Sequence, residues 1–152
     1  MNPRSALVVL RIYLGVIFAF AVWPKLRLGV AFPHQLAGFL TAVGLQNAHP
    51  FYQTFLTAVV IPHVTVFAFL VMLGECFVAL AMLTGTVTRL AGVVAMFLVT
   101  NYMFAKGLWW WNPSSNDSAF FFISLAMIIG AAGRSCGVDV YLARRWPRSV
   151  LW

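Results

Sequence analysis

Residues 71–83, VMLGECFVALAML, place one carboxylate, Glu75, within a run of apolar side chains. The surrounding segment 63–85 is long enough to cross a bilayer, because a spanning helix takes about 20 apolar residues. An unpartnered charge at the bilayer centre costs at least about 2.5–3.5 kcal/mol. This stretch therefore predicts a membrane-spanning helix whose carboxylate is paired, protonated or functional.

The composition of the whole chain also favours a membrane protein. Of the 152 residues, 62% are hydrophobic and 9% are charged, whereas about 25% are charged in a soluble domain. The formal net charge is +7, and the basic residues gather at the ends of apolar segments, where they set topology and contact lipid. Membrane lipids are therefore expected partners and nucleic acid is not. The length predicts one domain, residues 1–152.

Four apolar segments have the length of a membrane span, or nearly so. We expect these spans at residues 5–23, 63–85, 90–107 and 118–133. The predicted fold class is all-α: a polytopic membrane protein built as a four-transmembrane-helix bundle. Because Arg11 interrupts the apolar run of the first span, we expect a retained helix there and not a cleaved signal peptide.

Local signals predict where these helices begin and end. Pro24 and Pro62 are expected at or just outside helix ends, where a proline is least disruptive. Asn116 and Asp117 are placed to cap the start of the fourth span, and Gly133 is placed to end it.

The segment 34–61, between the first two spans, predicts short interfacial helices that lie at the membrane surface and pack on the bundle. Helical spacing within HQLAGFLTAV is followed by Leu36, Phe39, Leu40 and Val43. Gly44 is expected to end this first helix. A second helix is expected to begin at Pro50.

The cations predict that both termini lie in the cytoplasm. One side of a four-span bundle would hold Arg4, Arg89, Arg134, Arg144, Arg145 and Arg148. The other side would hold Lys25, Arg27 and Lys106. Cytoplasmic loops carry the excess of Lys and Arg, so the first set marks the cytoplasmic side. The basic tail, residues 138–152, then suits the cytoplasmic headgroup layer, although it would serve equally as a docking peptide.

Arg11 and Glu75 are predicted to pair inside the bundle. At 1.5 Å per residue they lie about 9 Å and about 15 Å from the cytoplasmic ends of their helices, and an arginine side chain spans the difference. Two interpretations stay open: the pair fixes helix order, or Glu75 handles a proton or a ligand such as a quinone headgroup. Asn101 and Tyr102 either complete this polar cluster or make an interhelical hydrogen bond.

The sequence gives little support for a metal site or for a disulfide bond. His34, His49 and His63 share no i, i+4 spacing and have no acidic companion, so we expect no metal site. Cys76 and Cys136 lie far apart and do not form a C-x-x-C motif. We therefore expect no covalently bound cofactor.

Two features face the predicted outer side. Lys25, Arg27 and Lys106 are candidate contacts for an anion. The three consecutive tryptophans at 109–111 are typical of an interfacial aromatic belt, or they stack on a ligand or a partner subunit.

Three short motifs resemble those of the DoxX-type family of membrane proteins. LRIYLGVIFAFAVWPKL at 10–26 is similar to the family's first helix, with its motif positions filled by Arg11, Gly15, Phe18 and Lys25. Val22 departs from the usual small residue. The second signature is matched at 74–92 by Gly74, Glu75, Gly85, Thr88, Arg89 and Leu90. GRSCGVD at 133–139 resembles the closing signature.

This resemblance implies a four-helix protein of a bacterial-type cytoplasmic (inner) membrane. Founding members of the family are linked to thiosulfate:quinone oxidoreductase. The expected function is a small, mainly structural accessory subunit of a respiratory or photosynthetic electron-transfer complex, packed against other membrane subunits.

The alternative is a quinone-linked oxidoreductase subunit of the thiosulfate:quinone type. In that interpretation Arg11 and Glu75 line a polar intramembrane pocket that binds a quinone or a lipid, and Glu75 is the candidate catalytic residue. A small-solute channel is disfavoured, because few polar residues follow any one helix face.

Overall fold

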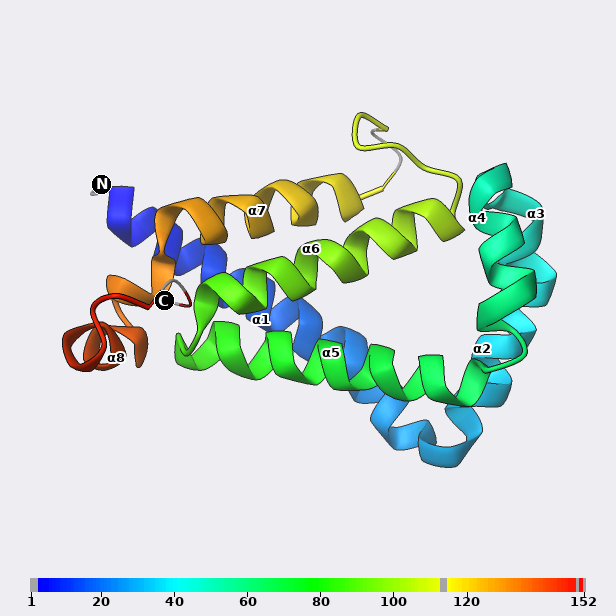
Figure 1. The fold of residues 1–152 in the computed structure, drawn as a ribbon, viewed down its shortest axis with the longest axis horizontal. Helices are drawn as coiled ribbons and strands as arrows, with labels where there is room; N and C mark the ends of the chain where they lie inside the picture. The colour runs from blue at the N-terminus through cyan, green and yellow to red at the C-terminus, as the bar shows by residue number, and fades with distance from the viewer. Residues whose placement is uncertain (1–2, 113–114, 150, 152) are drawn as a thin grey trace.

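The computed structural model describes residues 3–112, 115–149 and 151, and the regular elements within them are all helical (Figure 1). Four longer helices form the bundle: α1 (Pro3–Leu28), α5 (Val64–Thr84), α6 (Thr88–Ala105) and α7 (Asp117–Gly130). They pack in a ring, since α1 contacts α5 and α7, and α6 contacts α5 and α7. Shorter helices lie at the two ends of the bundle. The helix α8 (Asp139–Arg145) lies at one end, and a layer of crosswise helices lies at the other.

The crosswise helices, residues 32–60, lie across the end of the bundle opposite α8 (Figure 1). They comprise α2 (Phe32–Phe39), a π-helical turn (Leu40–Gly44), α3 (Leu45–Asn47), α4 (Pro50–Phe55) and a second π-helical turn (Leu56–Val60). A small core of their own is formed by Leu40, Ala48, Leu56 and Val60. Pro50 begins α4 as predicted, whereas Gly44, with φ −60°, continues the helix where an end was expected.

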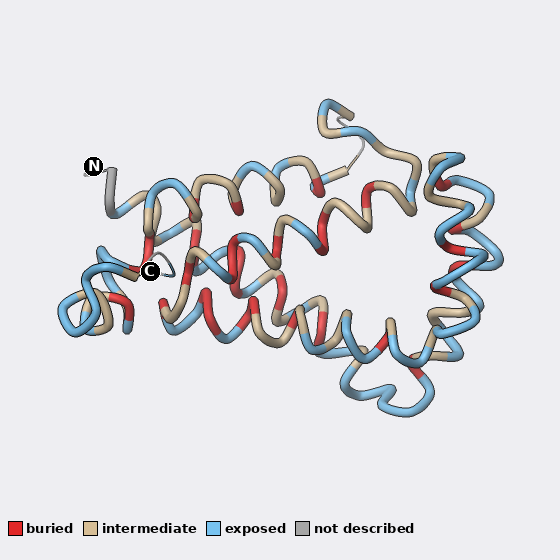
Figure 2. The backbone as a smooth tube through the Cα atoms, in the orientation of Figure 1, coloured by how far each residue is buried: buried red, intermediate tan, exposed pale blue. Residues whose placement is uncertain are grey.

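Within the described residues, three helical stretches are long and apolar enough to cross a membrane: Ser5–Asn47, Val64–Thr84 and Thr88–Ala105. Figure 2 shows that buried positions face the inside of the bundle while outward faces are exposed. The exposed positions include large apolar side chains, such as Phe20 at 74% and Leu80 at 65%. The apolar helix α7 has 14 residues and so is shorter than a typical span. Of the predicted tail 138–152, residues 150 and 152 lie outside the described residues.

Several helix ends differ from those predicted. Pro24 lies inside α1, which continues to Leu28. The proline removes only one backbone hydrogen bond, and Lys25 in the last turn forms an ion pair with Glu75 of α5. Asn116 makes no side-chain capping bond to α7. The carboxylate of Asp117 instead accepts a hydrogen bond from Lys106, which directly follows α6. The left-handed residue that follows α7 is Ala131, with φ 45°, and not Gly133.

The close packing of α1 on α5 sets how far the two antiparallel helices are shifted. A Cβ on Gly15 would lie 3.0 Å from Leu83 Cγ and 3.1 Å from Met82 Cβ, so only glycine allows this approach without a shift. Leu14 and Met82 are fully buried beside this contact. Counting back from this level at 1.5 Å per residue, Glu75 lies about level with Val22 and Trp23 of α1.

Asp139 joins the start of α8 to the start of α6. Its carboxylate is fully buried and accepts hydrogen bonds from the backbone N–H of Val87 (2.6 Å) and from the backbone N–H and hydroxyl of Thr88 (3.0 and 2.7 Å). The N–H of Gly133 in turn donates to the Thr88 hydroxyl at 3.2 Å. Asp139 therefore caps α6 from a distant part of the chain, because a helix start leaves N–H groups without partners.

We predict that Asp139→Ala lowers the free energy of unfolding by about 2–4 kcal/mol, because the capping acceptor is lost and buried donors are left unpaired. Unfolding of the detergent-solubilised chain with a denaturing detergent measures this. Tyr141→Phe is the matched control on α8, since Tyr141 is 71% exposed. Equal stability of Asp139→Ala and the control would contradict the capping role.

Candidate functional site

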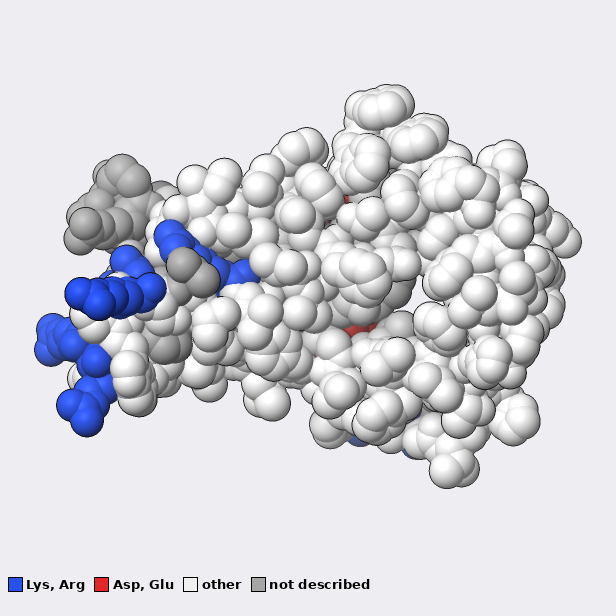
Figure 3. All heavy atoms as spheres, viewed as in Figure 1, with Lys and Arg blue, Asp and Glu red and all other residues white. Residues whose placement is uncertain are grey.

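A cavity of about 650 Å³ lies between the crosswise helices and the α5 and α6 helices of the bundle. The space-filling view shows this face of the molecule hollowed between the bundle and the crosswise helices (Figure 3). Most of the lining is leucine, valine and phenylalanine. The polar lining residues are Lys25, Gln35, Tyr52, Asn101, Tyr102 and Lys106. An apolar chamber with a few polar groups is the usual form of a small-molecule site.

Glu75 lies behind the polar part of the cavity lining and binds two of its residues. The carboxylate is fully buried and forms an ion pair with Lys25 of α1. The hydroxyl of Tyr102, on α6, donates a hydrogen bond to the same oxygen, Oε1, at 2.8 Å. The second oxygen, Oε2, is buried without a hydrogen-bond partner. Three helices of the bundle therefore meet at one carboxylate that keeps a free acceptor.

Lys25 and Tyr102 stand between this carboxylate and the cavity, since both line it whereas Glu75 is buried behind them. The side chain of Lys25 is 23% exposed, against 1% for Glu75. An ammonium group has three donors, so Lys25 can hold Glu75 and still donate to a molecule in the cavity. The arrangement can polarise a ligand oxygen and keep a proton carrier next to it.

A second polar contact connects the crosswise helices to the bundle. The hydroxyl of Tyr52 in α4 donates to Asn101 Oδ1 of α6 at 2.7 Å, and Asn101 Nδ2 donates to the carbonyl of Phe97 at 2.7 Å. Burial raises the pKa of Tyr52 to about 12. Tyr52 therefore stays a neutral donor at physiological pH, and Asn101 acts as an interhelical link rather than as a ligand of Glu75.

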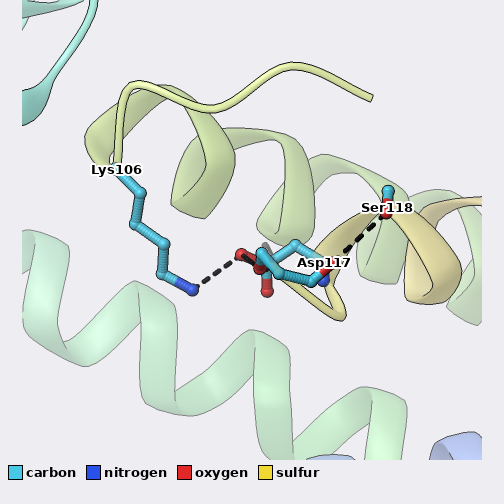
Figure 4. Close-up of polar contacts among 4 residues, drawn as sticks. Lys106, Asp117 and Ser118 are labelled. Atoms are coloured by element: carbon cyan, nitrogen blue, oxygen red, sulfur yellow. Dashed lines mark hydrogen bonds and ion pairs between the residues drawn. The ribbon is translucent and has the colours of Figure 1, made fainter. Parts of the chain in front are cut away.

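Lys106 occupies the rim of the cavity near the start of α7. Its ammonium donates to Asp117 Oδ2 at 2.6 Å, and Figure 4 shows this pair between the end of α6 and the start of α7. The hydroxyl of Ser115 also donates to Asp117 Oδ2, at 2.8 Å. The lysine side chain is 45% exposed, so this ion pair lies at the surface end of the cavity.

The tryptophan run packs back onto the crosswise helices. Trp109 lies with its ring 4.3 Å from the ring of His49 and stacks on Trp111 at 5.5 Å. A ring nitrogen of His49, Nε2, lies 3.0 Å from the carbonyl oxygen of Leu108. Among the described residues, no three His, Cys, Asp or Glu side chains gather where they could hold a metal ion.

The predicted Arg11–Glu75 pair is wrong. Arg11 lies at the other end of the bundle, where its guanidinium donates to the carbonyl of Cys136 and packs against Gly85 and Gly137. The shift between α1 and α5 explains this, since the level of Glu75 is roughly 17 Å along the axis from Arg11 at 1.5 Å per residue. Arg11 therefore does not line the cavity, and Lys25 takes the place predicted for it.

The candidate outer-side cations divide into three environments. Lys25 pairs with Glu75 and Lys106 pairs with Asp117. The guanidinium of Arg27 lies 4.9 Å from the ring centre of Trp23. The sequence analysis missed two features of the candidate site. One is Lys25 as the partner of Glu75, which the spacing of the first helix could have suggested. The other is Tyr52, for which the sequence carries no distinct signal.

An apolar bundle with a buried ion pair beside a cavity at membrane depth defines a polytopic helical membrane protein. Residues 6–151 match the family described as "TQO small subunit DoxD". The chain belongs to the DoxD family, and the resemblance to DoxX-type proteins is confirmed. No curated protein and no solved structure matches the chain significantly.

We predict that Lys25→Met lowers the free energy of unfolding by about 3–5 kcal/mol, because it leaves a buried carboxylate unpaired. The double variant Lys25→Met, Glu75→Gln should recover part of this loss, since no charge is then buried alone. Detergent-unfolding titrations of both single variants and the double variant measure the coupling. Arg27→Met, two residues further along α1, is the control. Additive effects of the two substitutions would show that the pair is not coupled.

Proposed function

We propose that this chain is a quinone-binding membrane subunit of a redox system of the thiosulfate:quinone oxidoreductase type. The family description supports the system, because TQO stands for that enzyme. The observation that carries the binding role is the 650 Å³ cavity with Lys25 and Tyr102 in its wall and Glu75 behind them.

The size and chemistry of the cavity fit a quinone. Small-molecule sites commonly enclose about 300–1,000 Å³. A quinone ring is apolar and carries two carbonyl oxygens that accept hydrogen bonds. The apolar side chains around the cavity suit the ring, and the ammonium of Lys25 supplies a charge-assisted donor for one carbonyl.

Glu75 suits the handling of protons. Reduction of a quinone to a quinol takes two electrons and two protons, and the family's sulfur donor would supply the electrons. Within this chain, the free oxygen of Glu75 can take or release a proton, and Tyr102 connects the carboxylate to the cavity wall. We assign Glu75 to proton transfer and Lys25 to positioning of the headgroup.

We also propose a four-span topology with both termini in the cytoplasm. Although α7 is short, it packs along α6 and α1 in the ring, and the short helix Ala132–Arg134 extends its path. The basic side chains gather at the end of the bundle that carries α8 (Figure 3). An excess of cations favours the cytoplasmic side. The cavity then opens nearer the outer side of the membrane.

This topology predicts that Cys136, which is exposed at the α8 end, reacts with a membrane-impermeant thiol reagent only from the cytoplasmic side. In a Cys76→Ser background, labelling of intact spheroplasts and of inverted vesicles separates the two sides. The control is Val30→Cys in a chain that also carries Cys136→Ser, because Val30 is 93% exposed at the opposite end. Labelling of both positions from the same side would contradict the topology.

For the binding role we predict that Lys25→Met and Tyr102→Phe each weaken quinone binding at least about tenfold, which corresponds to about 1.4 kcal/mol. Binding of a fluorescence-quenching quinone to the protein in lipid nanodiscs measures this. Tyr13→Phe is the matched control, because Tyr13 of α1 is 48% exposed and does not line the cavity.

An accessory role gives a different result in the same assay. If the chain only packs against other helices of a redox complex, quinone binds no more tightly to it than to empty nanodiscs, and neither variant changes the signal. That outcome would reject the binding role and favour the accessory subunit.

A further inference from the structure

The apolar side chains of the cavity lining differ sharply in exposure. Leu40 and Leu56, which close the cavity on the side of the crosswise helices, are 5% and 2% exposed. Leu70 of α5 and Phe97 of α6, which also line the cavity, are 51% and 67% exposed. The apolar lining is therefore closed at Leu40 and Leu56. It is open at Leu70 and Phe97 on the bundle, and also at Phe39 and Phe55 of the crosswise helices, which are 46% and 37% exposed.

This lateral opening, defined by Leu70 and Phe97, lies at the depth of lipid acyl chains. Leu70 lies about 9 Å along α5 from its first residue, Val64, and Phe97 lies about 12 Å from the last residue of α6, Ala105. The hydrocarbon core of a bilayer is about 30 Å thick. Side chains exposed at that depth contact lipid and not water.

The polar part of the lining lies next to this opening. Gly74, one turn beyond Leu70, lines the cavity next to buried Glu75, whereas Asn101 lies one turn from Phe97 toward the crosswise helices. The cavity thus runs from an apolar opening at the lipid to a polar wall that contains Lys25 and Tyr102. A molecule with a polar head and a long apolar tail matches this gradient, because the tail can remain in the opening where it replaces lipid.

We propose that a quinone with a long apolar tail enters from the bilayer between α5 and α6 and leaves its tail in the lateral opening. This inference rests on the proposed quinone-binding function and adds the route of entry and the place of the tail to it. Gly74, whose Cβ would lie 3.2 Å from Leu98 Cδ1, keeps α5 and α6 close on the inner side of this opening.

A quinone that carries a photoreactive diazirine on its tail tests the proposal in nanodiscs. We expect cross-links, competed by excess unlabelled quinone, in the peptides that contain Leu70 and Phe97. Competed cross-links confined to the crosswise helices or to the rim at Lys106 and Asp117 would overturn the lateral route while leaving quinone binding intact. A chain that gives no competed cross-link, and no quenching by the unlabelled quinone, would overturn the binding function itself.

Association kinetics provide the second measurement. Phe97→Trp narrows the lateral opening and should slow association of the long-tailed quinone several-fold, with a smaller effect on a tail-less quinone of the same headgroup. Phe20→Trp is the matched control, since Phe20 is 74% exposed on α1 and does not line the cavity. Equal rates for both variants and both quinones would overturn the lateral route.

Discussion

The burial of one carboxylate at membrane depth constrains much of this structure. Glu75 is fully buried on an apolar helix, and an uncompensated charge there would cost several kcal/mol. Its partner, Lys25, comes from the last turn of α1, so that helix must continue through Pro24 to Leu28. Tyr102 adds a donor from α6. The pair therefore fixes the mutual position of three helices and places the wall of the cavity.

The charged residues at the two ends of the bundle differ in their contacts. At the α8 end, the side chains of Arg11 and Asp139 bind backbone groups. Arg11 donates to the carbonyl of Cys136, and Asp139 caps α6. Glycine at position 85, with φ 71°, makes room for the Arg11 guanidinium. Arg11, Gly85 and Asp139 thus have structural explanations, although the buried Nε atoms of Arg11 and Arg89 have no hydrogen-bond partner. At the other end Glu75 keeps an acceptor without a partner, which is where a ligand or proton can act.

The sequence predicted the helical class and the family, because apolar segments and short motifs are local properties. It also singled out Glu75, whose charge stands out in an apolar run. It failed for the partner of Glu75, because depth was measured from assumed helix ends and not from the packing of Gly15 on Met82 and Leu83. Tyr52 was missed for a similar reason, since its contact with Asn101 depends on how the crosswise helices fold back.

The charge balance of the cavity bears on which substrate of a thiosulfate:quinone system it could hold. Two lysines line it, and each already has a carboxylate partner: Lys25 has Glu75, and Lys106 has Asp117. A thiosulfate dianion would lose its hydration in an apolar chamber without an unpaired cation to compensate, which is costly. A neutral quinone meets no such cost and still accepts a hydrogen bond from Lys25. Within the proposed function, the cavity is therefore better matched to a neutral quinone than to a thiosulfate anion.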